Sequence, residues 1–68
     1  MKPVSGKRMC RVLEKRGWAL IRTKGSHHAY RQAGNPRTIV VPVHGNKTLK
    51  TGTQASIMRD AGLTDDDL

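Results

Sequence analysis

The connections between the β-prone runs of this chain are short, and their length restricts the sheet that can form. Residues 18–24, 27–31 and 38–43 are predicted to be strands. Gly25-Ser26 and residues 33–36 separate them and have the composition of turns. A parallel pair of strands needs a crossover of about a dozen residues or more. The sequence therefore predicts a three-stranded antiparallel meander.

The last of these strands is the most β-prone stretch of the chain. Ile39, Val41 and Val43 alternate along it, so they are expected to share one face. Pro42 has no N–H for a neighbouring strand, which places this strand at an edge of the sheet or ends it there. Trp18 is expected to begin the first strand and to lie in the core, in preference to stacking on a base.

A helix is predicted before the strands. Ser5 is placed to cap it, and Gly17 suits the left-handed position that ends a helix. Between them, Met9, Val12 and Leu13 follow the i, i+3, i+4 spacing of a narrow apolar stripe. Another face carries basic side chains that form either a solvated surface or a track for phosphates: Lys7, Arg8, Arg11 and Lys15.

A second helix is predicted after the strands. Thr51 and Gln54 match a capping box, and Gly62 with Leu63 suits its C-terminal end. Thr64, followed by three aspartates, is placed to cap a last short turn. The predicted order is α-β-β-β-α, an α+β fold in which two helices cover one face of a three-stranded antiparallel sheet and leave the other open.

Charge is distributed unevenly along the chain. The net charge is +8, from 13 Lys and Arg against 5 Asp and Glu. Glu14 is the only acid within residues 1–59, which carry +12 (13 − 1), whereas residues 60–68 carry −4 from four aspartates. A basic body attracts polyanions and supplies phosphate affinity that does not depend on sequence. We therefore expect the protein to contact nucleic acid. The chain is expected to form one domain over residues 1–68, with its core at about 5–63 and an acidic tail at 64–68.

The same composition bears on the setting of the protein. No apolar run is long enough for a membrane span, and the first residues lack the apolar stretch of a secretory signal. The lone Cys10 cannot form an internal disulfide. It lies in the middle of the first predicted helix, so a buried or half-buried packing role is expected in preference to that of a catalytic thiol. A cytoplasmic protein is the expectation.

The histidines are the main candidates for chemistry. His27 and His28 follow the Gly25-Ser26 turn, and imidazole exchanges a proton near physiological pH. They point to opposite faces of a strand, so they cannot readily share a metal ion, and no metal or other cofactor is expected. His44 is a second proton carrier or, preferably, a loop residue held by hydrogen bonds. Basic residues expected to contact RNA phosphates surround them: Lys24, Arg31, Lys47 and Lys50.

Short patterns along nearly the whole chain resemble the HicA family of toxin RNases. They are Leu-Glu-Lys-Arg-Gly-Trp at 13–18, Lys-Gly-Ser-His-His at 24–28, Val-Pro-Val-His at 41–44, Lys-Thr-Gly-Thr at 50–53 and Ile-Met-Arg-Asp-Ala-Gly-Leu at 57–63. The resemblance implies a double-stranded-RNA-binding-domain-like fold, cleavage of mRNA without a metal, and a HicB antitoxin that masks the site.

The resemblance also implies which residues act. His27 matches the family's usual Gly-x-His position and is favoured as the catalytic residue, while the Gly-Ser-Asn-His pattern of some members selects His28. Thr51 departs from the basic residue that often precedes Gly-Thr, although Gly52-Thr53 is kept. The competing interpretations are a basic module that binds RNA without cutting it and a ribosome-associated structural protein.

Overall fold

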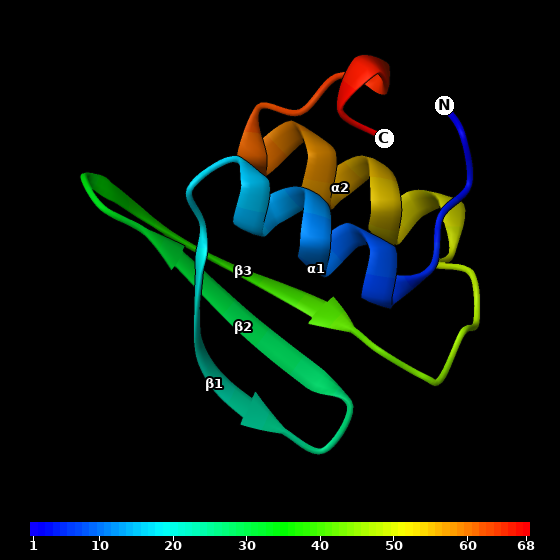
Figure 1. Ribbon diagram of the computed structural model, residues 1–68, viewed down its shortest axis with the longest axis horizontal. Coiled ribbons are helices and arrows are strands. Elements are labelled where there is room, and N and C mark those ends of the chain that lie inside the picture. Colours follow the sequence, from blue (N-terminus) through cyan, green and yellow to red (C-terminus); the bar gives the residue numbers. More distant parts are fainter.

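The computed structural model describes residues 1–68 and has the order α-β-β-β-α, followed by a short 3-10 turn. The two helices lie on one face of the sheet and leave the opposite face open (Figure 1). The predicted α+β fold is confirmed. The elements are α1 (Gly6–Lys15), β1 (Ala19–Lys24), β2 (His27–Gln32), β3 (Asn35–Pro42), α2 (Thr51–Ala61) and η1 (Asp65–Asp67).

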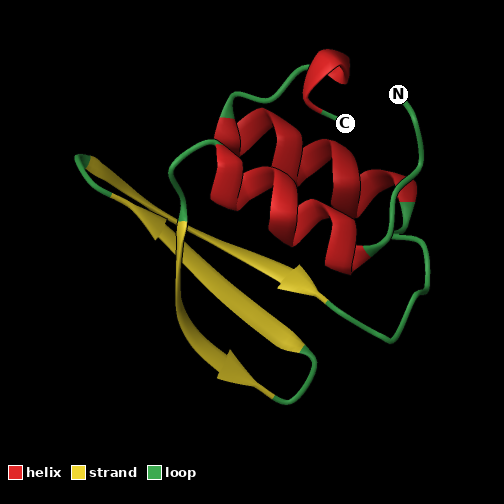
Figure 2. Ribbon diagram, viewed as in Figure 1, coloured by secondary structure: helices red, strands yellow, loops and turns green.

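The sheet is a meander in the order β1-β2-β3, and both neighbouring pairs are antiparallel (Figure 2). β2 is the central strand, so β1 and β3 are the edges. β3 ends at Pro42, as predicted, because proline cannot donate to a ladder.

Two strand boundaries differ from the prediction. Trp18 lies just before β1 instead of beginning it, although its side chain is buried in the core as expected. Only Ala33 and Gly34 form the second turn, so β3 begins at Asn35 and not at residue 38. Gly34 has φ +77°, a left-handed conformation that glycine adopts without strain.

A β-bulge in β1 changes the face on which its later side chains lie. Leu20 pairs with Tyr30 and Arg22 pairs with Ala29, so Ile21 is an extra residue in the ladder. Simple alternation would place Arg22 on the same face as Leu20. The bulge instead moves it to the open face.

The start of α1 follows the predicted capping pattern. The backbone N–H of Arg8 donates to Ser5 Oγ at 3.1 Å, which satisfies one of the free donors of the first turn. Val4 and Met9 are both buried in the same apolar cluster, as expected of a hydrophobic staple. Gly17, beyond the other end, has φ +88°.

Gly6 allows α1 to touch the end of β3. A Cβ on this residue would collide with the carbonyl oxygen of Pro42 and would lie 3.1 Å from Val43 Cα. The backbone of the helix therefore packs directly against the backbone of the edge strand. This contact fixes where β3 ends relative to α1.

The predicted capping box of α2 is wrong. Lys50 is the N-cap and has no acceptor in its side chain, while Thr51 is already helical. Gln54 is 1% exposed; its Nε2 donates to the carbonyl of Lys2 at 2.6 Å, and its Oε1 accepts from the N–H of Val4 at 3.1 Å. A buried amide must satisfy both ends, and Gln54 does so by holding the N-terminal segment.

The core lies between the helices and the sheet. Cys10 is buried there, and burial raises the pKa of its thiol, so the expected packing role is confirmed. Gly62 ends α2 with φ +67°, and Leu63 after it is buried. The clustered core residues are Val4, Met9, Cys10, Val12, Leu13, Trp18, Tyr30, Ile39, Val41, Leu49, Ile57, Met58 and Leu63.

The acidic end of the chain is held against α1. Thr64 caps η1 as predicted, through a capping box with Asp67. Arg16 pairs with Asp67 at 2.6 Å, and Arg8 donates to the carbonyl of Leu68 at 3.0 Å. Hydrogen bonding from the Thr64 N–H, with that from Arg16, lowers the pKa of Asp67. None of the helices is long and apolar enough to cross a membrane.

Candidate functional site

The two neighbouring histidines lie on opposite faces of β2, as predicted. Tyr30 identifies the covered face, because it is buried and its hydroxyl donates to Glu14 of α1 at 2.8 Å. His28 shares this face and is half-buried beside α1. His27 is exposed on the open face.

His27 has a basic neighbour directly across the strand. Lys24 of β1 is its partner on one side and Pro42 of β3 on the other. Directly paired residues project from the same face with Cβ atoms about 5 Å apart. Ala29, the next residue of β2 on this face, pairs with the exposed Arg22. The imidazole of His27 makes no hydrogen bond within the protein, so both of its nitrogens are free for a ligand.

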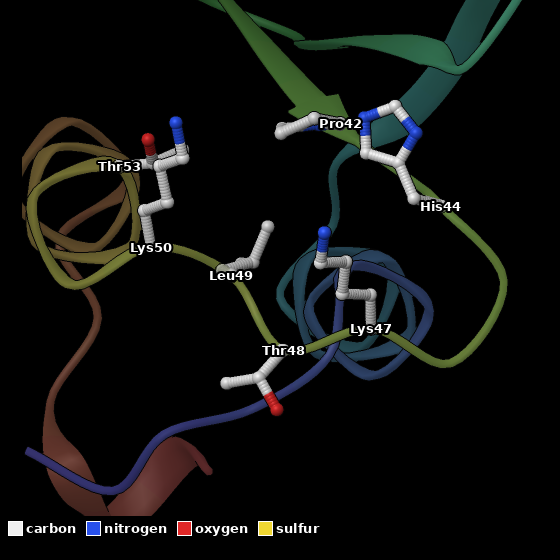
Figure 3. A pocket seen from close by; sticks show the side chains of 7 residues that line it. All are labelled: Pro42, His44, Lys47, Thr48, Leu49, Lys50 and Thr53. Atoms are coloured by element: carbon white, nitrogen blue, oxygen red, sulfur yellow. The ribbon is translucent and has the colours of Figure 1, made fainter.

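A basic pocket, here called the loop pocket, lies beyond the end of β3. It has a volume of 370 Å³ and shares Pro42 with the surroundings of His27. The side chains of His44 and Lys47 gather near Pro42, and those of Lys50 and Thr53 point together on another side of the opening (Figure 3). Its lining residues are Pro42, His44, Lys47, Thr48, Leu49, Lys50 and Thr53.

The N-terminus of α2 lies at this pocket, because its N-cap Lys50 and Thr53 of its first turn both line it. The first N–H groups of a helix have no acceptor within the helix, and they favour anions. Lys50 supplies no side-chain cap, and Gly52 adds no bulk above these amides, since the space around its Cβ position is open. Two lysines, a threonine hydroxyl and these amides form a surface suited to a phosphate.

His44 differs from the prediction that hydrogen bonds hold it in the loop. Its carbonyl accepts from the N–H of Lys47 at 3.0 Å, so the backbone does stabilise the loop. Its imidazole, in contrast, is exposed and makes no hydrogen bond within the protein. The side chain is therefore available for a ligand.

His28 belongs to a different site. It lines a groove of 280 Å³ between α1 and the sheet, together with Lys7 and Arg11. The only carboxylate nearby, that of Glu14, is engaged by Tyr30. Burial and the bond to the Cys10 thiol raise the pKa of Tyr30 well above its usual range, so its hydroxyl stays protonated.

The predicted RNA-binding residues do not all come together. Lys24 lies beside His27, and Lys47 and Lys50 line the loop pocket. Arg31 shares the open face but lies four residues along β2, about 13 Å away at the usual rise per residue. Its guanidinium donates to the carbonyl of Asn35 at 3.5 Å. It faces the far end of the sheet.

Arg22 is a basic residue of the open face that the sequence pattern does not reveal. It joins Lys24 there only because of the bulge at Ile21, which simple alternation does not predict. The basic side chains of α1 also differ from one another in whether they have a partner within the protein. Arg8 is engaged by the acidic tail, while Lys7 and Lys15 are free of hydrogen bonds and exposed.

The structure has no group of three or more His, Cys, Asp or Glu side chains placed to hold a metal ion. None of the curated proteins matches this chain. A family model described as the HicA toxin of bacterial toxin–antitoxin matches residues 6–63 of the 68. The match confirms the resemblance seen in the sequence patterns, and the chain belongs to the HicA toxin family.

Proposed function

We propose that this protein is an endoribonuclease toxin that cleaves mRNA without a metal, with His27 as the catalytic proton-transfer residue. The observation that supports this most is the exposed, unengaged imidazole of His27 on the open face, opposite Lys24 and beside the loop pocket. The HicA family consists of toxins of bacterial toxin–antitoxin pairs, and the resemblance of this chain to the family implies mRNA cleavage as the activity.

The chemistry requires few groups. Cleavage without a metal uses the ribose 2′-OH as the nucleophile, so a base must take its proton while the phosphorus is attacked. A positioned proton-transfer group contributes typically about 10²–10⁴-fold. The imidazole of His27 is exposed and makes no hydrogen bond within the protein, and histidine is the side chain best suited to proton transfer near neutral pH. Lys24, directly across the strand, would stabilise the negative charge that develops on the phosphate.

RNA would lie across the open face and into the loop pocket. Lys24, Lys47 and Lys50 supply ammonium groups for successive phosphates, and Arg31 extends the basic surface toward the other end of β2. These interactions are electrostatic, so they bind phosphates irrespective of base sequence.

The family also implies a protein partner, the antitoxin of a toxin–antitoxin pair. We propose that a HicB-like antitoxin of acidic character covers the open face around His27 in the cytoplasm and denies RNA access to it. Charge complementarity with the basic face would speed its association. The test is co-purification of the neighbouring reading frame's product with this chain and protection of His27 in the complex; a tight partner that leaves His27 accessible would contradict masking.

A basic module that binds RNA without cutting it is the alternative. The observation that favours it is the lack of a carboxylate near His27 to orient the imidazole, since Glu14 bonds to Tyr30 and every Asp lies at residue 60 or beyond. Such a module would bind the same phosphates through the same lysines.

One experiment separates the two functions. The protein is incubated with a defined mRNA in excess EDTA, and both binding and chain cleavage are followed. We expect cleavage with EDTA present. Tight binding with intact RNA would favour the binding module, and cleavage that appears only when a divalent cation is restored would contradict the metal-free mechanism.

A further inference from the structure

We propose that His44 is the second proton carrier of the cleavage reaction, the general acid that protonates the leaving 5′-oxygen. The inference rests on the proposed function. It follows from where the fold places this side chain relative to His27 and to the phosphate-binding groups of the loop pocket.

The sheet register places the two imidazoles on the same side of the molecule. His27 pairs with Pro42, and pairing continues one step further because the N–H of Val43 donates to the carbonyl of Ser26 at 2.7 Å. Pro42 and His44 both line the loop pocket, while Val43 between them packs toward the core, so His44 lies on the side of the chain that carries Pro42. Residues at such diagonal positions are about 7–8 Å apart between Cα atoms, within reach of two imidazoles that face one phosphate.

The loop that carries His44 is anchored and not free. Its backbone turns at Gly45 and is closed by the bond from the Lys47 N–H to the His44 carbonyl. Further along, Leu49 is buried and its N–H donates to the carbonyl of Val4 at 2.9 Å. The loop therefore holds the backbone of His44 in place, while its exposed imidazole makes no hydrogen bond and does not contribute to the stability of the fold.

No other side chain on this side of the molecule is suited to the role. The other basic groups that line the loop pocket or face His27 are lysines, and an ammonium group is a poor proton donor at neutral pH. Glu14 is engaged by Tyr30 on the covered face, and the aspartates lie in the acidic end of the chain. His28 faces α1. His44 is the remaining histidine on this side of the molecule, and imidazole is the side chain best suited to proton transfer near neutral pH.

Two imidazoles account for both proton transfers of the cleavage step. Neutral His27 takes the proton of the 2′-OH as the 2′-oxygen forms a bond to phosphorus. The bond from phosphorus to the 5′-oxygen breaks with its electron pair on that oxygen, and protonated His44 gives it a proton. The products are a 2′,3′-cyclic phosphate on one fragment and a 5′-OH on the other. Exchange with water returns both histidines to their starting forms.

A substrate with sulfur in place of the scissile 5′-oxygen tests this assignment. A thiol leaves readily as thiolate, since its pKa is near 8.5, and so needs no general acid. For His44→Ala we expect cleavage of the oxygen substrate to fall by about 100-fold or more, the range of a lost proton-transfer group. The sulfur substrate should be cleaved at close to the unsubstituted protein's rate. His27→Ala should be slow on both, because the attacking 2′-OH is unchanged.

Asn46→Ala is the matched control, because Asn46 is exposed in the same loop and makes no side-chain hydrogen bond. It should cleave both substrates normally. If His44→Ala is slow on both substrates, or normal on the oxygen substrate, His44 is not the general acid, and the proposed nuclease function stands. If the unsubstituted protein cleaves neither substrate, the proposed function fails and this inference fails with it.

Discussion

The two faces of the sheet differ in what their side chains do. On the covered face, Tyr30 is buried and bonded to Glu14, and Leu13 of α1 is fully enclosed. On the open face, His27 and Lys24 are exposed and have no partner within the protein. One face therefore carries most of the folding free energy, and the other is free to meet a ligand. The histidine doublet spans this division, so two adjacent residues are expected to respond differently to substitution.

Truncating the core should have the largest effect on stability. Leu13→Ala removes a fully buried side chain and should cost about 2–5 kcal/mol of unfolding free energy, a large share of what a domain of this size has. Val40→Ala, on the open face, should cost less than about 1 kcal/mol. Urea unfolding of both variants measures the difference. Equal losses would mean that the two faces are not separated energetically.

RNA affinity should depend on the loop pocket more than on α1. Replacing Lys47 and Lys50 with Ala together should weaken RNA binding and reduce the slope of log affinity against log salt by about 1.4, at roughly 0.7 for each phosphate that a lysine neutralises on a single strand. The control removes the same charge from α1, with Lys7→Ala and Lys15→Ala combined. Titrations of RNA binding at several salt concentrations compare the affinities of the two double variants. An equal loss in both double variants would indicate a diffuse field and no localised phosphate site.

The smallest effect is expected at the acidic tail, which belongs to neither face. Asp67 has a lowered pKa in the folded protein, so it stabilises the fold above its unfolded pKa of about 4, and this contribution is lost as pH falls through the folded value. Asp67→Asn should therefore lower stability slightly at neutral pH and flatten the acid side of the stability curve, leaving RNA cleavage unchanged.

Melting temperatures measured between about pH 2 and about pH 7 test this expectation, because that range extends from well above the unfolded pKa of an aspartate to the acid side, where the lowered pKa lies. Asp66→Asn is the control, since it removes a neighbouring carboxylate that makes no hydrogen bond, and it should leave the curve as it is. An identical response in both variants would refute the role of the Arg16 pair with Asp67.

Much of the fold was predictable because its signals are local. Ser5 and Gly17 bound α1 through their own backbone geometry, and the two-residue turn at Gly25-Ser26 fixes the pairing of Lys24 with His27. The bulge at Ile21 was not predictable in this way, because it reflects how β1 fits its neighbours and not any residue of its own.

Interactions between distant residues explain the other differences. Gln54 looks like the end of a capping box, yet it holds the N-terminal segment through Val4, which lies 50 residues away in the sequence. Gly6 needs its missing Cβ only because β3 ends against it. The gathering of His44 and Lys47 near Pro42 likewise depends on a loop whose far end is tied down by Leu49. The candidate residues were visible in the sequence, but their grouping was not.

The measurement that tests the central claim most directly compares His27→Ala with His28→Ala in RNA cleavage, in EDTA, with unfolding free energies determined for both. We predict that His27→Ala lowers the cleavage rate by at least about 100-fold and leaves the fold as stable as before, because His27 is exposed on the open face. His28→Ala should keep cleavage activity and affect mainly stability. The opposite pattern would move the catalytic role to the groove beside α1, and full activity in both variants would contradict histidine catalysis.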